Sequence, residues 1–473
     1  MSATNPTIRA MTENRDDLIS AGATWDDVVG GAVRRPDSAG YDDERVGFQL
    51  VAAHRPAVVV AARNSDDIRA AVRFAAAEGV PVAVQATGHG LATPLDGTGV
   101  LISTRRMTAV TVNAAERTAW VEAGARWRDV IDAAGPHGLA PLSGSLPGVG
   151  AVSYTLGGGV GLMARRYGFA ADHVRRIDLV TADGRLRRVT ATGDPDLFWA
   201  LRGGGGNFGV VTGMEIDLVP VDRIHGGGLF FDLARTPELA AEWYRWTASL
   251  PEEMTSAVSM LPFPDLPGIP EPLRGRHVGQ IQIAFLGSAK DGDELVAPLR
   301  ALGPVFDGLQ EIPYAESAVV FNEPDQPHAY QGENLLLRDV EPTGLPALTT
   351  LSAPTNPTMC VVGLRHLGGA LSRPPAVPNS VGHRAAGYLL GVLSPTTPNQ
   401  VDAVRAMHAT ALEPWSAHAV GRSLNFTFGA VDQDTVRAAF APQDYRRITE
   451  IKAALDPQLL FRPNFLIPPS ADS

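Results

Sequence analysis

The sequence predicts an α+β protein with more than one structural unit. Between residues 55 and 220, short apolar runs typical of strands alternate with stretches of helical periodicity. The chain has 473 residues, more than the roughly 250–300 at which a single hydrophobic core stops growing. We therefore expect two or three units, and residues 221–414, where elements are more widely spaced and Pro-rich loops intervene, have the pattern of a second domain.

The first expected elements are a strand over residues 57–62, a helix over 65–78 and a strand over 81–85. Asn64 is a suitable N-cap for this helix because its short polar side chain can accept from exposed backbone amides, and Gly79 is a suitable end. The further expected elements are strands near 109–112, 118–123, 210–219 and 361–368, a helix over 194–201, and a final apolar-patterned helix that begins near residue 444 and closes at Asp456-Pro457.

Composition and charge exclude several classes of protein. Hydrophobic residues make up 45% of the chain and charged residues 19%, which fits a globular protein rather than a disordered one. The net charge is −11 and basic runs are absent, so we expect no nucleic-acid partner. Residues 1–20 lack an apolar signal segment and no stretch of 18 apolar residues follows, which predicts a soluble cytoplasmic protein without a membrane partner. Cys360 is the only cysteine, so redox chemistry requires a bound cofactor.

A formal G-x-G-x-x-G pattern occurs at residues 204–209. The dinucleotide-binding fingerprint requires a strand before the glycines and a helix after them. Here the order is the reverse, since a helix-like stretch precedes them and a strand-like stretch follows. We therefore expect a tight turn at this place and not a nicotinamide dinucleotide site.

Two other glycine-rich stretches indicate a ligand-binding site. His89 follows a predicted strand and stands between Gly88 and Gly90, which leave its ring open to a ligand. A lone histidine more often serves packing, so this observation gains weight only with a second glycine-rich stretch, residues 143–161. Exposed amides in such backbone can bind phosphate groups.

Several motifs resemble the FAD-binding domain of the vanillyl-alcohol oxidase and para-cresol methylhydroxylase (PCMH) superfamily, in particular its berberine bridge enzyme-like oxidases. They are Arg55-Pro56-Ala57, residues 82–90, Leu156-Gly157-Gly158-Gly159-Val160-Gly161, residues 165–172, 180–184 and 194–204, and the tail with Tyr445, Lys452, Asp456-Pro457, Phe461 and Asn464. The resemblance implies a two-part FAD-binding domain and an α+β substrate domain whose antiparallel sheet covers the flavin. The implied bounds are 1–54 and 55–222 for the FAD-binding region, 223–425 for the substrate domain and 426–473 for a segment that returns to the FAD domain.

The resemblance also implies site residues. His89 occupies the place of the histidine that bonds to the flavin 8α carbon, although the family motif Arg-Ser-Gly-Gly-His reads Gln85-Ala86-Thr87-Gly88-His89 here. The position of a second linking cysteine is Leu146, so a second covalent bond is excluded. Ala151 stands where the family gates oxygen access. The implied FAD contacts are Gln85, Ala86, Thr87, Gly88, His89, Gly90, Leu146, Pro147, Gly148, Val149, Gly150, Ala151, Tyr154, Gly157, Gly158, Gly159, Gly161, Asn207, Gly209, Val210 and Asn464.

The implied activity is oxidation of an alcohol or amine carbon of a small molecule, with hydride transfer to flavin N5 and reduction of oxygen to peroxide. The substrate is expected to be a secondary-metabolite alcohol, an alkaloid-like amine or an oligosaccharide, and the protein a monomer or homodimer. Two alternatives stay open, a dehydrogenase or oxidative cyclase with another acceptor, and a flavin-binding protein without activity. Candidates for the catalytic base are Tyr154, His366, Tyr445 and Asn425, although a packing role suits Tyr445 better, and Trp243, Trp246, Phe263, Tyr314 and Phe321 are candidates for the substrate pocket.

Overall fold

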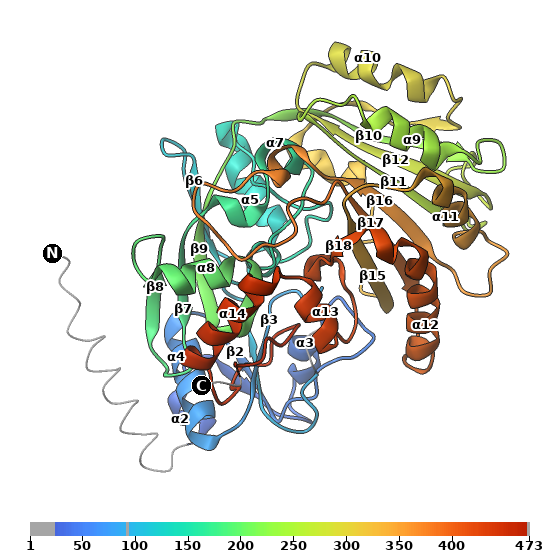
Figure 1. Cartoon of the computed structure of the whole chain (residues 1–473). Coiled ribbons are helices and arrows are strands. Elements are labelled where there is room, and N and C mark those ends of the chain that lie inside the picture. The colour runs from blue at the N-terminus through green and yellow to red at the C-terminus, as the bar shows by residue number, and fades with distance from the viewer. Residues whose placement is uncertain (1–23, 91–93, 471–473) are drawn as a thin grey trace.

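The computed structural model describes residues 24–90 and 94–470, so the first 23 residues of the expected 1–54 segment lie outside the described residues. Three sheets and the helices around them make an α+β architecture, as predicted. Figure 1 shows the first two sheets on one side of the molecule and the third sheet with its helices on the other.

The first sheet has four strands in the order β1-β2-β4-β3. Its strands are β1 (Ala32–Arg34), β2 (Val58–Ala61), β3 (Val82–Gln85) and β4 (Val100–Ser103). β4 lies between β2 and β3 and is parallel to both, whereas β1 is antiparallel to β2. The expected helix is α4 (Ser65–Glu78), where the Asn64 side chain accepts from Asp66 N and Asp67 N, and Gly79 ends the helix with a φ of 66°.

The second sheet has five strands, all antiparallel, in the order β5-β6-β9-β7-β8. They are β5 (Val110–Asn113), β6 (Thr118–Glu122), β7 (Val174–Val180), β8 (Leu186–Val189) and β9 (Val210–Asp217). The glycines of residues 203–209 lie between α8 (Pro195–Gly204) and β9. The order helix, glycines, strand is confirmed, and it is the reverse of a dinucleotide-binding unit.

The third sheet is the largest, and its pairings are antiparallel. Its main path runs β13-β10-β12-β11-β16-β17-β15-β18, and β14 pairs with β10. The strands are β10 (Arg223–Asp232), β11 (Met254–Pro262), β12 (His277–Phe285), β13 (Phe306–Asp307), β14 (Gln310–Pro313), β15 (Tyr330–Leu337), β16 (Val361–His366), β17 (Tyr388–Pro395) and β18 (Ala419–Gly421).

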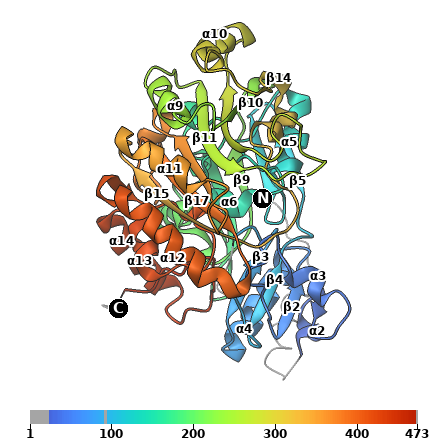
Figure 2. The ribbon, with the colours of Figure 1, turned by 90° about the vertical axis from the view of Figure 1, so that its right-hand side faces the viewer.

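Helices α9 (Leu239–Thr247), α10 (Ala289–Arg300), α11 (Leu345–Leu351) and α12 (Val401–Leu412) cover the outer face of this sheet (Figures 1 and 2). The core below them contains Trp243 and Trp246, which therefore face away from the inner side of the sheet. The other helices are α2 (Trp25–Val28), α3 (Tyr41–Arg45), α5 (Trp127–Ala134), α6 (Ala151–Leu156), α7 (Ala164–Tyr167), α13 (Gln433–Ala438) and α14 (Pro442–Leu455).

The C-terminal segment returns to the first two sheets. Val82 N donates to Leu460 O at 2.8 Å and Arg462 N donates to Val82 O at 2.7 Å, so this segment pairs with the start of β3. Figure 1 shows α14 beside α8, far from α12, which precedes it in the chain. The first and last parts of the chain thus share one core, which includes Leu460 and Phe461.

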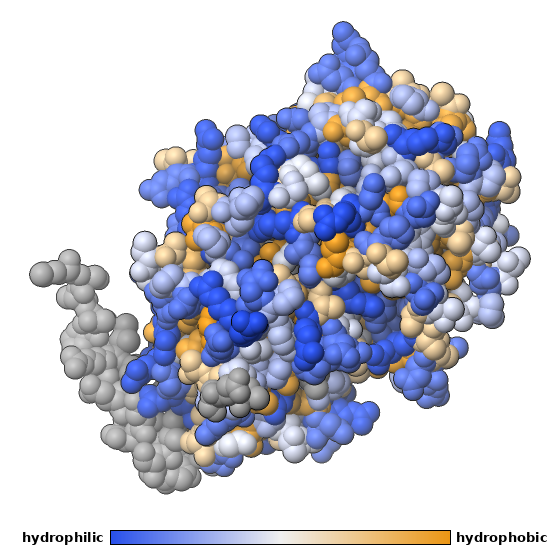
Figure 3. All heavy atoms as spheres, viewed as in Figure 1, coloured by the Kyte–Doolittle hydropathy of each residue, from blue (hydrophilic) through white to orange (hydrophobic). Residues whose placement is uncertain are grey.

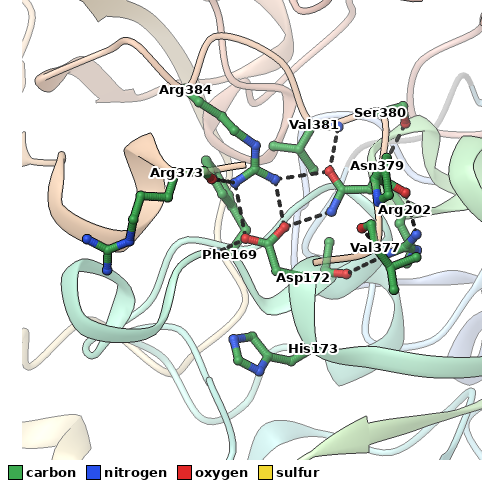
Figure 4. Close-up of polar contacts among 12 residues, drawn as sticks. Phe169, Asp172, His173, Arg202, Arg373, Val377, Asn379, Ser380, Val381 and Arg384 are labelled. Carbon is green, nitrogen blue, oxygen red and sulfur yellow. Dashed lines mark hydrogen bonds and ion pairs between the residues drawn. The ribbon is translucent and has the colours of Figure 1, made fainter. Parts of the chain in front are cut away.

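A polar network joins the loop before β17 to the short 3-10 helix Ala170–His173, which precedes β7 (Figure 4). The Asp172 carboxylate accepts from Arg384 Nη2 at 2.6 Å and Nη1 at 3.1 Å, and from Asn379 Nδ2 at 2.7 Å. Arg202 is buried nearby and donates to the backbone carbonyls of Val377 and Pro378. Charge-assisted bidentate bonds of this kind fix geometry well, so the network holds the third sheet against the second.

Hydrophilic and hydrophobic side chains are interspersed over the face shown in Figure 3. The described helices include none with the length and apolar character needed to cross a bilayer.

Candidate functional site

A cavity of 1170 Å³ lies between the inner face of the third sheet and the glycine-rich loops of the first two sheets. Typical ligand pockets have volumes of about 300–1,000 Å³, so this one can hold a large cofactor or a cofactor with a substrate. Its lining comes from both ends of the chain, from Phe48 to Phe465.

Successive side chains of a strand point to opposite faces of a sheet, so alternate residues of the third sheet form one wall of the cavity, here called the sheet wall. On β12, Ile281 and Ile283 belong to the core under the helices, whereas Gln280 and Gln282 line the cavity. Both glutamines are buried, and Gln280 Nε2 and Gln282 Oε1 have no hydrogen-bond partner among the described residues. Buried amides without partners are costly, so these two atoms are suited to binding a polar group of a ligand.

His89 lines the opposite side of the cavity, in the loop that follows β3. Its ring stacks on Phe48 with centroids 3.9 Å apart and an interplanar angle of 13°. Nδ1 lies at hydrogen-bond distance, 2.8 Å, from Thr87 Oγ1, and Gly150 N donates to the same oxygen at 3.3 Å. Nε2 is buried without a hydrogen-bond partner in the described part of the chain. Burial lowers the pKa of His89 to about 4, so the ring is neutral at pH 7 and one nitrogen keeps a free lone pair.

Two glycines allow the loops and the C-terminal part of the chain to approach closely. A Cβ at Gly90 would lie 2.0 Å from Asn464 Nδ2, and a Cβ at Gly157 would lie 1.8 Å from Asn425 Oδ1. Neither distance is possible, so any side chain at these positions would displace the asparagines. Asn425 in turn donates to Tyr154 O at 2.9 Å.

The cavity brings together about half of the predicted cofactor contacts. Those that line it are Ala86, His89, Gly90, Leu146, Val149, Tyr154, Gly157, Gly209, Val210 and Asn464. The others do not line it, namely Gln85, Thr87, Gly88, Pro147, Gly148, Gly150, Ala151, Gly158, Gly159, Gly161 and Asn207. Gln85 turns away to donate to Glu44 O at 3.0 Å, and Asn207 uses its amide to bind Gly204 O, Phe465 O and Ile467 N.

Of the candidates for the base, Tyr154 and Asn425 line the cavity. The Tyr154 ring packs edge-on against Trp127, with centroids 5.4 Å apart, and its hydroxyl is buried without a hydrogen-bond partner in the described residues. Burial raises the pKa of this hydroxyl far above its ordinary value. Tyr154 is therefore protonated at neutral pH, so its hydroxyl is suited to donating a hydrogen bond to a ligand.

His366 and Tyr445 lie outside the cavity. His366 Nε2 is 2.9 Å from Arg165 Nη1, and burial beside that cation lowers the pKa of His366 to about 3. Tyr445 packs near Phe440 and under Arg437, which agrees with the packing role that suits its position on the helix face. Among the aromatic candidates, Phe263 and Phe321 line the cavity, whereas the Tyr314 hydroxyl is bound to Ser143 Oγ at 2.8 Å.

Sequence reasoning missed the polar residues of the sheet wall and of the loop before β15. Besides the two glutamines they are Ser259, Gln310, Asn322, Glu323, His328, Tyr330, Glu333 and Arg365. The sequence could have indicated the glutamines, because residues 280 and 282 are polar and alternate with apolar residues, which predicts that both side chains lie on the same face of a strand. Arg365 likewise interrupts an apolar strand.

Comparisons with known proteins agree with this geometry. Residues 56–190 match the sequence model of the FAD binding domain family. The uncharacterised FAD-linked oxidoreductase YgaK of Bacillus subtilis is 26% identical over 93% of this chain and 97% of its own length. The (R)-6-hydroxynicotine oxidase of Paenarthrobacter nicotinovorans is 34% identical over 41% of this chain and 43% of its own. The structure of BBE-like 1 from Physcomitrella patens superposes with a TM-score of 0.79, at 19% identity, over 96% of this chain and 99% of that one.

Proposed function

We infer that this chain, an FAD-linked oxidoreductase with an FAD-binding domain, is an oxidase whose FAD is linked covalently to His89. We further infer that it oxidises an alcohol or amine carbon of a small organic molecule. Bound FAD would supply a hydride acceptor for that carbon, and oxygen would take up the two electrons together with two protons, one of them released from the hydroxyl or amine, to give hydrogen peroxide. The observation that supports the linkage best is the buried Nε2 of His89, which faces no hydrogen-bond partner among the described residues.

The residues around the cavity fit FAD. The volume of 1170 Å³ accommodates a dinucleotide, and backbone at Gly90, Gly157 and Gly209 forms part of the wall. Glycine backbone of this kind offers amides to phosphate oxygens without a side chain in the way. The neutral ring of His89 supplies a nucleophilic nitrogen, and Phe48 holds the plane of that ring.

The chain's own residues would orient the substrate and exclude water. Phe263, Phe306 and Phe321 supply an apolar surface, and Gln280 and Gln282 offer a donor and an acceptor to a polar group of the substrate. The protonated hydroxyl of Tyr154 can donate to the oxygen or nitrogen on the carbon that is oxidised. A substrate that is partly aromatic or aliphatic and carries a hydroxyl or amine group matches these walls.

Acid denaturation tests the proposed linkage. The purified protein is precipitated in acid, and absorbance and intact mass show whether flavin stays with the polypeptide. We expect retention in the wild type and release from His89→Ala. His328→Ala is a matched control, because this histidine also lines the cavity and packs edge-on against Phe48, 5.4 Å between centroids. Release of flavin by the wild type, or retention by His89→Ala, contradicts the linkage.

The choice of oxygen as acceptor has a separate test. The flavin is reduced with dithionite under anaerobic conditions and mixed with air-saturated buffer while its absorbance is followed. An oxidase recovers the oxidised spectrum within seconds and produces peroxide. A spectrum that stays reduced for minutes favours a dehydrogenase, and a flavin that a broad panel of alcohols and amines cannot reduce favours a protein without activity.

A further inference from the structure

Arg365 is a charged residue of the cavity to which the proposed oxidation gives no role. It lies on β16, where Val362 and Leu364 point into the core under the helices. Because successive side chains of a strand point to opposite faces, Arg365 points to the inner face, and it lines the cavity. Its strand partner on β11, Ala257, is small and lines the cavity too, which leaves room for the long side chain.

Two aromatic rings hold the guanidinium group. Its Cζ atom lies 4.4 Å from the centroid of the Phe321 ring and 4.9 Å from that of the Phe426 ring. These rings come from different parts of the chain, and both line the cavity. Aromatic rings interact with a guanidinium through its charge and its flat faces, and they leave its N–H groups unbonded. The two rings thus fix the side chain in place and leave its donors accessible to a ligand.

The charge of Arg365 is balanced weakly. Glu323 Oε1 lies 3.8 Å from Arg365 Nη2, which is too long for a hydrogen bond, and this oxygen already accepts from Ser145 Oγ at 3.0 Å. Within residues 24–90 and 94–470 the guanidinium has the ion pair at 3.8 Å and no side-chain hydrogen bond, and the side chain is 24% exposed. The other charged residues of the lining differ, since Glu333 is paired with Arg422 at 2.8 Å and Arg462 donates to Leu459 O.

A guanidinium has five N–H donors in a planar fork, and those of Arg365 are accessible to a ligand because the side chain is 24% exposed. A carboxylate matches this fork, because its two oxygens accept two parallel hydrogen bonds, and it is small enough to belong to a substrate. We propose that the cavity binds a carboxylate of the substrate through Arg365, so that the substrate class is a hydroxylated or aminated organic acid. This proposal rests on the proposed function for the chemistry at the other end of the substrate.

Ligand titration tests the anion site. The purified flavin-containing protein is titrated with benzoate and with benzamide, an uncharged compound of the same shape, by calorimetry and by the change in flavin absorbance. We expect benzoate to bind and benzamide to bind at least about tenfold more weakly, because hydrogen bonds to charged groups are worth more than neutral ones. Arg365→Gln should weaken benzoate binding by a similar factor, and Arg365→Lys, which keeps the charge without the fork, by less.

Glu323→Gln should change the affinity in the opposite direction. It removes a negative charge 3.8 Å from the guanidinium, so benzoate should bind several times more tightly than in the wild type. Arg176→Gln is the matched control, since that arginine also lies over an aromatic ring, Trp120 at 4.4 Å, but belongs to β7 and pairs with Asp178. The Arg176→Gln variant should bind benzoate with the affinity of the wild type.

Equal binding of benzoate and benzamide, or unchanged affinity in Arg365→Gln with wild-type circular dichroism, overturns the anion site. Calorimetry needs neither turnover nor a covalent flavin. If the wild type releases flavin in acid but still binds benzoate, the result contradicts the proposed function alone. If the wild type retains flavin but does not prefer benzoate, the result contradicts the anion site alone.

Discussion

Replacing Lys452 by Met should destabilise the protein strongly. Lys452 is one of only two lysines in the chain and lies fully buried on α14. Its Nζ donates to Asp456 Oδ2 at 2.6 Å and to Asn207 O at 2.7 Å. Methionine would keep most of the volume but leave the Asp456 carboxylate buried without its counter-ion.

Removing one partner of a buried ion pair costs about 3–5 kcal/mol in free energy of unfolding, far more than the net value of the pair itself. Asp456 still accepts from Leu460 N at 2.7 Å and Phe461 N at 3.1 Å, which favours the lower part of that range. The double variant Lys452→Met with Asp456→Leu should recover only part of the loss, because those two amides then lack an acceptor.

Urea denaturation followed by circular dichroism measures the change. The control is Lys290→Met, the other lysine, which also has an acidic partner one turn away, Glu294 at 3.8 Å, but is exposed on α10. That pair should contribute no more than about 0.5 kcal/mol. If the two single variants lose the same stability, the reasoning from burial is wrong.

Two further predictions concern stability. Asn64→Ala should lower the free energy of unfolding by about 1 kcal/mol, since it removes the two cap bonds of 3.0 Å to α4, and Asn64→Asp, which keeps the acceptor, should not; equal loss in both variants would contradict the cap. Burial lowers the pKa values of His54 and His408 to about 4, below the 6.5 of the unfolded chain, so stability should fall as the pH decreases from 6.5 to 4. Urea titrations at several pH values should show a shallower decline for His408→Gln, and an unchanged decline would argue against this histidine.

Local signals in the sequence were enough for part of the fold. The capped helix α4, the strands next to it and the reversed order around residues 204–209 follow from N-cap chemistry, periodicity and glycine positions. Each of these depends on interactions between residues close in the chain, which is why the sequence alone could predict them.

The site was less predictable, because its walls are made by residues distant in the chain. Gln85 and Asn207 carry polar side chains in the right motifs, yet both turn to backbone partners, and for Asn207 these include Phe465 O. His366 has the chemistry of a base but is bound to Arg165, about two hundred residues earlier. Only the packing of the third sheet over the loops decides which of these side chains meets the cavity.

The pairing of residues 460–462 with β3 also bears on how the chain is made. β3 is an edge strand of the first sheet, and its outer side is bonded by a segment near the end of the sequence. Until that segment has been synthesised, the edge is open to pairing with other chains, and Phe461 and Asn464 are missing from the cavity wall. The cavity wall is therefore incomplete until residues 461–465 have been synthesised, so a ligand that needs the whole wall cannot be held before the chain has reached them.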